Sequence, residues 1–559
     1  MLDEPAARGS ARSARAPRLD FQDHLADLEA EGLLVRVERP INKDTELHPL
    51  VRWQFLGGIP EDARRAFLFT NVIDSRGRRY AIPVVVGALA ASPRIYAMGM
   101  GTPVAEIGAA WMQALANPIP PVAAAAPPAC QEVVITGEAL RAPGGGLAAL
   151  PVPVSTPGFD AAPYLAATLC ITRDPDNGIQ NMGMYRAALK ATDRLAVRMV
   201  AGTAKAGGYL HWLKYRERKQ PMPCAIVIGC APVAVYTGPQ NLGVDMDEMA
   251  VAGALAGAPL RSARAVTVDL AVPADAEIVI EGIIDTGILE PEAPFGESNG
   301  YVAPEAFNMP MRVTAITRKR SPVFVSLISQ VTPSESSVIR KVVQEPFFLA
   351  HLRDHLWIKG IRRVVMHEPL TNLRPMMFLQ FAHGTAKNEV WRGLKGAASL
   401  RPDFGKIVIA VSEDIDPGST DAVLWSLAYR SNPIEDVHLA PYRGGVQGAQ
   451  YGPRHSESTM LIDATLKRAM PPLALPAREF MERARAIWEE LGLPRVAVPS
   501  PWHGYNLGDW SDTWQRFADR AAAGEWEKNG AETLARSRRG LDPETPVREV
   551  ERPASPSRP

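Results

Sequence analysis

The feature that most constrains the fold is a dense run of short β-rich segments between residues 131 and 330. Segments such as EVVIT, AATLCITRD, CAIVIG and EIVIEGIID concentrate β-branched residues and are bounded by Gly, Pro or Asp. Helical patterns interrupt them at Thr192–Ala206 and at Asp247–Ala256. Because the strands do not alternate regularly with helices, the pattern predicts a β-rich, barrel-like domain rather than a repeating βαβ unit.

The regions on either side of this stretch have a different rhythm. Beyond about residue 335, the helical pattern SSVIRKVVQEPFFLAHLRDHL precedes the strand IRRVVMHE, and a helix, the strand GKIVIAVSED and the helix TDAVLWSLAYRS follow. This alternation predicts a separate layered α/β domain. On the N-terminal side, Phe21–Val35 shows helical spacing that ends near Gly32, and a strand and two β-rich runs, LFTNVI and YAIPVVVG, come next. A smaller α/β segment is expected there.

These changes of pattern divide the chain into six stretches. The Pro- and Ala-rich run ANPIPPVAAAAPP marks the first internal boundary, and the last stretch has a composition that cannot offset its own ordering entropy. The predicted stretches are a disordered leader (1–18), an N-terminal α/β segment (19–125), a β-rich domain (126–332), a C-terminal α/β domain (333–500), Trp-rich helices (501–536) and a flexible tail (537–559).

Composition and charge argue against several classes of protein. The chain carries 61 Lys and Arg against 61 Asp and Glu, so it lacks the basic excess of a protein that binds nucleic acid by neutralising phosphates. Its longest nearly apolar stretch, Ala81–Ala91, is shorter than the ~20 residues of a spanning helix, so no membrane association is expected. The four Cys form no CxxC pair, which fits a reducing compartment. We therefore expect a soluble, cytoplasmic protein.

Generic catalytic motifs are absent from the sequence, but two short runs are unusual. There is no Rossmann glycine fingerprint, no phosphate-binding loop and no HExxH, and the pair His351/His355 lacks a third metal ligand. The first unusual run, Asn181–Arg186 (NMGMYR), follows a strand and a turn, and an apolar helix is expected after it. The second run, Glu290–Tyr301 (EPEAPFGESNGY), carries three carboxylates and is stiffened by two Pro.

Residue chemistry alone leaves two interpretations of these runs open. Arg186 either points a permanently charged, planar group into a site or lies on the surface at a helix start. The acidic run is either a solvated loop or a rigid loop that presents carboxylates from a β scaffold. Two carboxylates near one Arg can be driven apart in pKa, so that the one paired with Arg stays ionised and the less solvated one becomes a usable acid.

Together the two runs resemble the UbiD family of decarboxylases, which use prenylated FMN. The family pattern is N-x-G-x-Y-R, followed further along the chain by E-x-P-[FY]-G-[ED]-x-x-G-Y, and both occur here in that order. PMPCAIVIGCAP (221–232) and DFQDHLADLEAEGLLVRVERPI are similar to two further family segments. The resemblance extends from about residue 19 to about residue 530.

The resemblance implies roles for several residues. In the implied catalytic set, Glu292 pairs with Arg186, and Glu297 donates the proton that replaces CO2. Decarboxylation needs an electron sink that no side chain provides well, so a cofactor has to supply it. The resemblance implies that prenylated FMN is held through a divalent metal, typically Mn2+, with K+ nearby. The implied cofactor-binding residues are Met184, Tyr185, Arg186 and Lys205, and the implied metal ligands are Asn181, Glu248 and His211.

The sequence departs from the family pattern at two places. The family's third metal ligand is a His, but the expected stretch, 202–206, contains none. Either His211 becomes the ligand rather than an ordinary helix-face His, or Lys205 meets the phosphate directly. A Lys that some relatives carry before a late D-A-T run is Thr459 here. The candidates for that late phosphate contact are Arg454 and Lys467.

The resemblance also implies an architecture and an activity. The fold would be α+β, with a central split β-barrel that binds the flavin, an N-terminal α/β segment and a C-terminal α/β oligomerisation domain. A homo-oligomer (dimer or hexamer) and a flavin prenyltransferase that supplies the cofactor are expected. The implied activity is removal of CO2, reversible in some relatives, from an aromatic, heteroaromatic or α,β-unsaturated carboxylic acid.

Three alternative functions stay open on the sequence. The Trp-rich region, expected to pack through its aromatic side chains or to cover the pocket, resembles longer-tailed relatives that act on aromatic acyl-CoA thioesters such as phthaloyl-CoA. No cluster of Arg and Lys marks a CoA phosphate site, however. A flavin oxidoreductase would share the barrel but would not explain the Glu-Arg-Glu set. A non-catalytic subunit of a carboxylase complex would fit the missing His.

Overall fold

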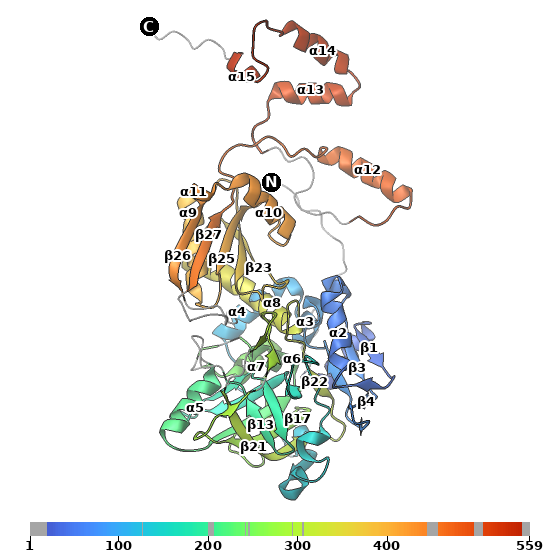
Figure 1. The fold of residues 1–559 in the computed structure, drawn as a ribbon, viewed down its shortest axis with the longest axis vertical. Helices are drawn as coiled ribbons and strands as arrows, with labels where there is room; N and C mark the ends of the chain where they lie inside the picture. Colours follow the sequence, from blue (N-terminus) through green and yellow to red (C-terminus); the bar gives the residue numbers. More distant parts are fainter. Residues whose placement is uncertain are drawn as a thin grey trace. The chain divides into compact units, whose positions relative to one another are not determined.

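The computed structural model describes residues 19–550 except residues 126, 200–205, 241, 244–245, 293, 304–306, 444–456 and 497–506. The chain forms two compact units, one ending at Thr465 and the other beginning at Leu466. The first unit contains an N-terminal segment, a central antiparallel sheet and a C-terminal layered region, which follow one another from blue to orange in Figure 1. The fold is mixed α+β, as the sequence predicts.

The N-terminal segment combines a capped helix with a mixed sheet. Helix α1 (Phe21–Ala30) begins at Asp20, whose side chain accepts a hydrogen bond from the backbone N–H of Gln22. Leu25 and Leu28 lie on its buried face. The sheet runs in the order β1 (Leu34–Val37), β3 (Ala66–Phe69), β6 (Val84–Val86) and β22 (Phe324–Ser326). Its last strand therefore comes from the end of the β-rich region, so the N-terminal segment is completed by distant sequence.

The central sheet is antiparallel throughout its main path, and β21 (Phe307–Arg318) is its longest strand. The path through the described residues is open, so the split β-barrel stays a prediction. The strands along it are β11 (Gln180–Gly183), β10 (Thr168–Arg173), β14 (Met222–Ile228), β17 (Ile278–Ile284), β21, β13 (Arg194–Val197), β12 (Ala187–Ala191) and β9 (Tyr164–Leu165), with β8 (Val133–Thr136) and β18 (Glu290–Pro291) also paired with β21.

Two helix predictions in this region are wrong. The strand β12, rather than an apolar helix, follows Arg186, and β13 occupies part of the helix expected over Thr192–Ala206. β13 hydrogen-bonds to β12 on one side and to β21 on the other, so pairing with distant residues overrides the local pattern. A helix, α5, instead spans Gly207–Glu217. The other expected helix is confirmed as α7 (Glu248–Ala256).

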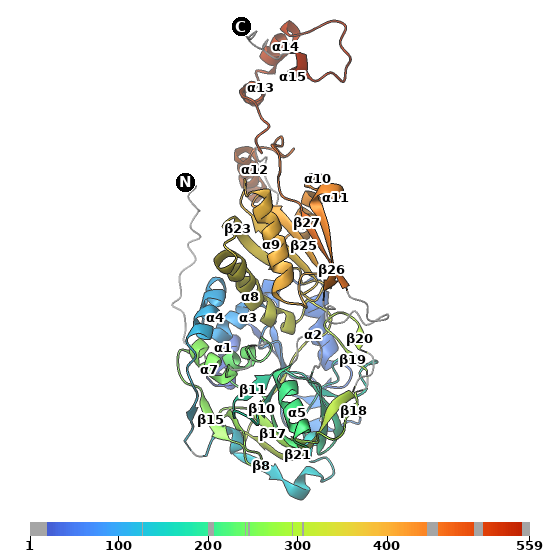
Figure 2. The ribbon, with the colours of Figure 1, turned by 90° about the vertical axis from the view of Figure 1, so that its left-hand side faces the viewer.

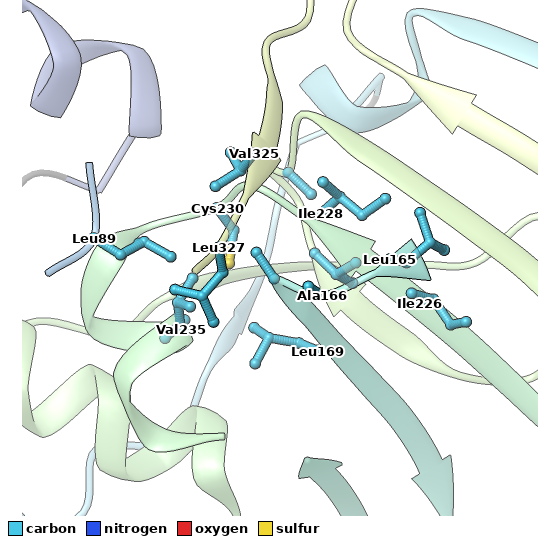
Figure 3. Close-up of a cluster of buried hydrophobic side chains, with 14 of the residues drawn as sticks. Leu89, Leu165, Ala166, Leu169, Ile226, Ile228, Cys230, Val235, Val325 and Leu327 are labelled. Atoms are coloured by element: carbon cyan, nitrogen blue, oxygen red, sulfur yellow. The ribbon is translucent and has the colours of Figure 1, made fainter. Parts of the chain in front are cut away.

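The main hydrophobic core lies where the N-terminal segment meets the central sheet. Figure 3 shows side chains from β10 and β14 packed against residues that follow β6 and β22. Burial on this scale is the largest favourable contribution to folding, and it fixes the strands that carry the candidate site. The labelled core residues are Leu89, Leu165, Ala166, Leu169, Ile226, Ile228, Cys230, Val235, Val325 and Leu327.

The C-terminal region of the first unit is a five-stranded sheet. Three central strands are parallel and two edge strands are antiparallel to them. Neighbouring side chains of the central strands alternate between two separate cores, which is the pattern of a sheet buried on both faces. The strand order is β23 (Ile361–Met366), β24 (Met376–Phe381), β25 (Ile407–Ser412), β27 (Glu457–Asp463) and β26 (Val437–Arg443).

Helices cover both faces of this sheet. α9 (Lys387–Leu400) contributes Leu394 to one core, and α10 (Thr420–Arg430) contributes Val423 to the other. Figure 2 shows α9 lying along the sheet. α8 (Glu335–Ala350) packs beside β23 and continues into a short π-helix that contains His351 and His355. The layered α/β arrangement expected beyond residue 335 is therefore present.

The second unit consists of helices connected by extended segments. α12 (Arg478–Glu490), α13 (Asp512–Ala522), α14 (Trp526–Ala535) and the short α15 (Val547–Val550) are its helices in the described part of the chain. None of the helices that the structure describes combines the length and apolar character needed to cross a bilayer.

Candidate active site

Arg186 is held at the junction of two strands of the central sheet. The run begins in β11, and Gly183 is required because a Cβ there would lie 2.2 Å from the ring of Tyr185. The carbonyl of Tyr185 accepts a hydrogen bond from the hydroxyl of Thr168 at 2.5 Å. The backbone N–H of Arg198 donates to the carbonyl of Arg186 at 2.9 Å. The Arg186 backbone is therefore fixed on both sides.

The acidic run forms a braced loop beside Arg186. The carboxylate of Asp160 accepts one hydrogen bond from the backbone N–H of Gly296, at 2.9 Å, and another from Thr156. The backbone of Glu297 donates to the carbonyl of Tyr301 and accepts from the N–H of Val331. These contacts hold the loop at its centre and at its far end.

Arg186 binds both carboxylates of the run. Its Nε and Nη2 donate to the two oxygens of Glu292 at 2.8 and 2.9 Å, and its Nη1 donates to Oε1 of Glu297 at 2.6 Å. The first pair is bidentate, the geometry that a guanidinium provides and an ammonium does not. The structure therefore brings together all three residues predicted as the catalytic set.

An aromatic pair supports the guanidinium of Arg186. The ring of Phe295 lies 4.4 Å from its central carbon and packs against the ring of Tyr164, with the ring centres 4.3 Å apart. Burial alone would lower the pKa of Arg186, but the hydrogen bonds to Glu292 and the charges of both carboxylates raise it above its usual value. Burial raises the pKa of Tyr164, and the charge of Glu292 adds to that effect. Arg186 is thus a fixed cation.

The two carboxylates differ in exposure and in hydrogen bonding. The Glu292 side chain is 2% exposed with both oxygens bound to Arg186, and that of Glu297 is 26% exposed. Oε2 of Glu297 accepts no hydrogen bond from the residues that the structure describes. Glu292 is therefore both the less solvated carboxylate and the one that makes more hydrogen bonds to Arg186. Glu297 is the one with an oxygen available to a reacting group.

The predicted metal ligands Asn181 and Glu248 lie at neighbouring positions. Glu248 is buried at the first residue of α7 and accepts a hydrogen bond from the N–H of Met182, the residue after Asn181. Burial raises the pKa of Glu248 to about 7 despite that hydrogen bond. The side-chain oxygen of Asn181 faces Gly207, where a Cβ would lie 1.9 Å from it. An amide oxygen and a carboxylate suit a hard divalent cation, so these two residues fit an oxygen-ligated metal.

His211 is engaged inside the fold. Its Nδ1 is 2.8 Å from the hydroxyl of Thr172, and its Nε2 is 3.9 Å from the carboxylate of Asp174. Burial lowers the pKa of His211 to about 4, so the ring is neutral near pH 7. Thr172 and Asn181 are directly opposed on β10 and β11, which brings His211 to the region of Asn181. Within the described residues, no three His, Cys, Asp or Glu side chains form a metal-binding group.

The remaining predicted residues have different environments. The hydroxyl of Tyr185 accepts hydrogen bonds from the side chain of Asn181 and the N–H of Gly208, both at 3.2 Å. Burial raises its pKa to about 12. The N–H of Met184 donates to the carbonyl of Gly238. Lys205 and Arg454 lie outside the described residues, and Lys467 belongs to the second unit.

Sequence reasoning missed three side chains that shape this site. Phe295 lies inside the quoted run, so the motif contains it, but nothing in the run indicates that it stacks on Arg186. Tyr164 lies on β9, and its sequence context carries no signal. Arg198, with Nε 3.9 Å from Oε2 of Glu292, adds a second cation to the buried carboxylate. These contacts arise from strand pairing and are invisible in a local pattern.

Comparisons with known proteins identify the family of the chain. Domain models of 3-octaprenyl-4-hydroxybenzoate carboxy-lyase match residues 25–115 (N-terminal domain), 122–331 (Rift-related domain) and 337–464 (C-terminal domain). Together they span most of the chain. The chain belongs to the UbiD family, whose members are carboxy-lyases, that is, decarboxylases.

Individual relatives cover nearly the same region. The chain is 27% identical over 453 residues to the uncharacterized protein sll0936 of Synechocystis, which covers 76% of this chain and 84% of that protein. The UbiD-class enzyme HmfF of Pelotomaculum thermopropionicum, solved with FMN, is 26% identical with a TM-score of 0.71, covering 86% of this chain and 97% of HmfF. An evolved dimeric form of HmfF is solved with prenylated FMN. Vanillic acid decarboxylase of Sedimentibacter hydroxybenzoicus shares the fold at 23% identity and a TM-score of 0.70, covering 85% and 100%.

Proposed function

We propose that the chain uses prenylated FMN to remove CO2, in a step that is reversible, from an aromatic, heteroaromatic or α,β-unsaturated carboxylic acid. Arg186, Glu292 and Glu297 are its catalytic residues in this proposal. The observation that carries it is one largely buried guanidinium, 14% exposed, bound to two carboxylates of unequal exposure. Binding of FMN and prenylated FMN by HmfF supports the choice of cofactor.

The three residues have different roles, which follow from their positions in the site. Arg186 stays charged throughout, because its pKa is raised, and it keeps Glu292 ionised and oriented through a bidentate contact. Prenylated FMN, when bound, supplies the electron sink for the carbon–carbon bond that breaks. The body of the loop excludes water from Glu292, and the partial exposure of Glu297 gives it a route to solvent protons.

The proton balance follows from this division. When CO2 leaves, the electron pair of the broken bond stays with the substrate carbon. The carboxylic acid form of Glu297 donates its proton to that carbon and becomes a carboxylate beside Arg186. A proton from solvent then restores Glu297, which its 26% exposed side chain permits. Positioned proton transfer of this kind contributes a rate factor of about 10²–10⁴.

The cofactor phosphate requires its own residues. In the proposal Asn181 and Glu248 would hold a divalent metal, Mn2+ by family resemblance, which would supply positive charge for the cofactor phosphate. Met184 and Tyr185 would line the flavin site. Either His211 would be the third metal ligand, or Lys205 would contact the phosphate directly. A K+ ion near the phosphate is proposed on the family resemblance alone. A homo-oligomer, cofactor supply by a flavin prenyltransferase, a cytoplasmic location and a central split β-barrel belong to the same proposal.

The test is a single substitution in the loaded enzyme. Glu297→Gln keeps the hydrogen bond to Arg186 but removes the transferable proton, so CO2 release from a panel of aromatic and unsaturated acids and their CoA esters should fall about 10²–10⁴-fold. The protein is co-expressed with a flavin prenyltransferase, and the flavin absorbance of each preparation is measured.

The matched control is Glu290→Gln in the same loop. Glu290 pairs with Arg194 at 2.6 Å and does not contact Arg186, so its loss should change the rate little. Unchanged CO2 release in Glu297→Gln with normal flavin content would overturn the proposed role of Glu297. Turnover of CoA esters alone would move the assignment to a thioester substrate.

A further inference from the structure

A single peptide group connects helix α2 (Leu47–Leu56), which carries Arg52, to the backbone of Glu297. It is the peptide between Gln330 and Val331. Its carbonyl oxygen accepts a hydrogen bond from Nη1 of Arg52 at 2.8 Å. Its N–H donates to the carbonyl of Glu297 at 3.2 Å. Because a peptide group is planar and stiff, Arg52 holds one side of a unit whose other side holds the residue proposed as the proton donor.

Arg52 binds Gln330 through a forked contact. Its Nη2 donates to Oε1 of the Gln330 side chain at 2.6 Å, so one guanidinium binds both the backbone and the side chain of the same residue. The Gln330 residue is 2% exposed, and Arg52 is partly buried. Burial lowers the pKa of Arg52 to about 10, so the guanidinium is still charged near pH 7. A Lys at this position lacks the planar fork that reaches two acceptors at once.

The peptide held by Arg52 leads directly into a strained residue. Val331 has a φ of 32°, a value that β-branched residues rarely adopt. Such a conformation persists only where the surroundings hold it, and it occurs preferentially at functional sites. On the C-terminal side, the hydroxyl of Thr332 donates to the carbonyl of Glu368 at 2.6 Å, and the carbonyl of Thr332 accepts from the N–H of Leu370 at 2.9 Å. Arg52 provides the restraint on the N-terminal side.

The bond from Val331 positions the Glu297 backbone relative to the rest of the protein. Within the hairpin, the Glu297 carbonyl also accepts from the N–H of Gly300, and the Glu297 N–H donates to the carbonyl of Tyr301. Among the described residues, Val331 makes the hydrogen bond that reaches the Glu297 backbone from outside the hairpin. The contact between Glu297 and Nη1 of Arg186, at 2.6 Å, depends on where this backbone lies.

We propose that Arg52 is a positioning residue for the proton transfer, and that it acts through the Gln330–Val331 peptide to set where the Glu297 carboxyl group lies. The inference rests on the proposed role of Glu297. Both hydrogen bonds that the Arg52 side chain makes to described residues go to Gln330, so its influence on Glu297 passes through this segment.

The test is a double-mutant cycle in the cofactor-loaded enzyme. Arg52→Met removes both hydrogen bonds to Gln330, and kcat for CO2 release should fall about 10- to 100-fold with little change in KM, because a misplacement of about 1 Å costs up to 10²-fold. Arg52→Lys keeps the charge and one bond and should retain an intermediate rate. In the Glu297→Gln background, Arg52→Met should lower kcat no further, since both changes act on one step. The same fold-loss in both backgrounds would overturn the inference.

Hydrogen exchange in the cofactor-free full chain provides a readout that needs no turnover. Peptides covering residues 295–301 and 326–331 should exchange faster in Arg52→Met than in wild type, with Arg52→Lys in between. The control Arg78→Met also removes two hydrogen bonds to backbone carbonyls, those of Gly144 and Ala148, and should change neither this exchange nor kcat.

The outcomes separate this inference from the proposed function. Unchanged exchange at residues 295–301 in Arg52→Met would show that Arg52 does not hold the Glu297 loop, and the inference would be wrong. Absence of CO2 release from every acid by the wild type would refute the proposed function instead, and the exchange data would still decide whether Arg52 holds the loop.

Discussion

At the scale of single residues, the site depends on charges that have few substitutes. Arg186 satisfies two carboxylates with three nitrogens in one plane, and a Lys has neither the plane nor the reach for this. Glu292 is 2% exposed, so removal of Arg186 would leave a buried carboxylate with only Arg198, 3.9 Å away, to offset its charge. The pair therefore needs both members for its geometry and for its charge balance.

Glu248 allows a residue-scale prediction about metal binding. The substitution Glu248→Gln keeps an acceptor for the N–H of Met182 but removes the negative charge that a divalent cation requires. We expect the divalent metal content of the cofactor-loaded protein to fall at least about tenfold. Elemental analysis of purified, cofactor-loaded protein measures it.

A matched control separates this effect from a general change of charge. Glu217 is an exposed glutamate at the end of α5, and Glu217→Gln should leave the metal content unchanged. Equal metal content in Glu248→Gln and in the control would exclude Glu248 as a ligand.

The grouping of Arg186, Glu292 and Glu297 could be predicted from sequence because they lie in two runs that resemble the family pattern. Their contacts could not be predicted from composition or periodicity, and the chemistry of the residues alone left a surface Arg and a solvated loop open. Arg198 gave no signal at all, since it reaches Glu292 only through the pairing of strands distant in sequence. His211 stays a prediction, because its ring nitrogens face Thr172 and Asp174.

At the scale of elements, the acidic loop works as a braced hairpin. β19 (Phe295–Gly296) pairs with β20 (Val302–Ala303), and Asp160 holds the N–H of Gly296. A Cβ on Gly296 would lie 2.4 Å from Oγ1 of Thr156, closer than real atoms approach. Position 296 therefore requires a glycine, because the hairpin leaves no space for a side chain there.

The substitution Gly296→Ala tests that constraint. It should displace Phe295 and Glu297 together and lower kcat at least about tenfold, because a misplacement of about 1 Å costs up to 10²-fold. Initial rates and far-UV circular dichroism check the effect and the fold. The control Gly530→Ala adds its Cβ in open space and should have no effect on rate. A Gly296→Ala enzyme with the full wild-type rate would contradict a rigid loop.

Elements with strong local patterns were predicted well, and elements defined by their neighbours were not. The helix at Phe21–Ala30 follows clear periodicity, and the strand at Ile407–Ser412 is rich in β-branched residues. The strand Met376–Phe381 was missed because a short, continuously apolar run cannot be told from a buried helix by periodicity. It is a strand because it lies between β23 and β25.

At the scale of the whole molecule, distant segments complete one another. β22 extends the N-terminal sheet, and buried Glu277, the residue before β17, accepts hydrogen bonds from Gln22 and Lys319. Residues up to Thr465 form one compact unit, and the domain boundaries predicted within residues 19–500 stay a prediction. Domain division from composition cannot foresee such long-range pairing, because each segment shows only its own pattern.

The interior of the first compact unit also contains a carboxyl group that should make the free energy of unfolding depend on pH. Glu335, the first residue of α8, is fully buried and accepts a hydrogen bond from the N–H of Ile328. Burial raises its pKa to about 8 although backbone N–H groups oppose the effect. Between the usual pKa of 4.5 and this value, the folded protein keeps a proton that the unfolded chain has lost. Stability contributed by this group therefore falls as pH rises through that window.

The substitution Glu335→Gln should remove this pH dependence. Gln keeps an acceptor oxygen for Ile328 and never ionises, so the variant should gain stability relative to wild type as pH rises from 5 to 8, on the order of 3 kcal/mol at neutral pH. Melting temperatures of both proteins across that range measure the difference. Glu345, whose pKa burial also raises, is present in both proteins and cancels in the comparison. If the melting temperatures of the two proteins change with pH in parallel, the Glu335 carboxyl ionises in the folded protein as readily as in the unfolded chain.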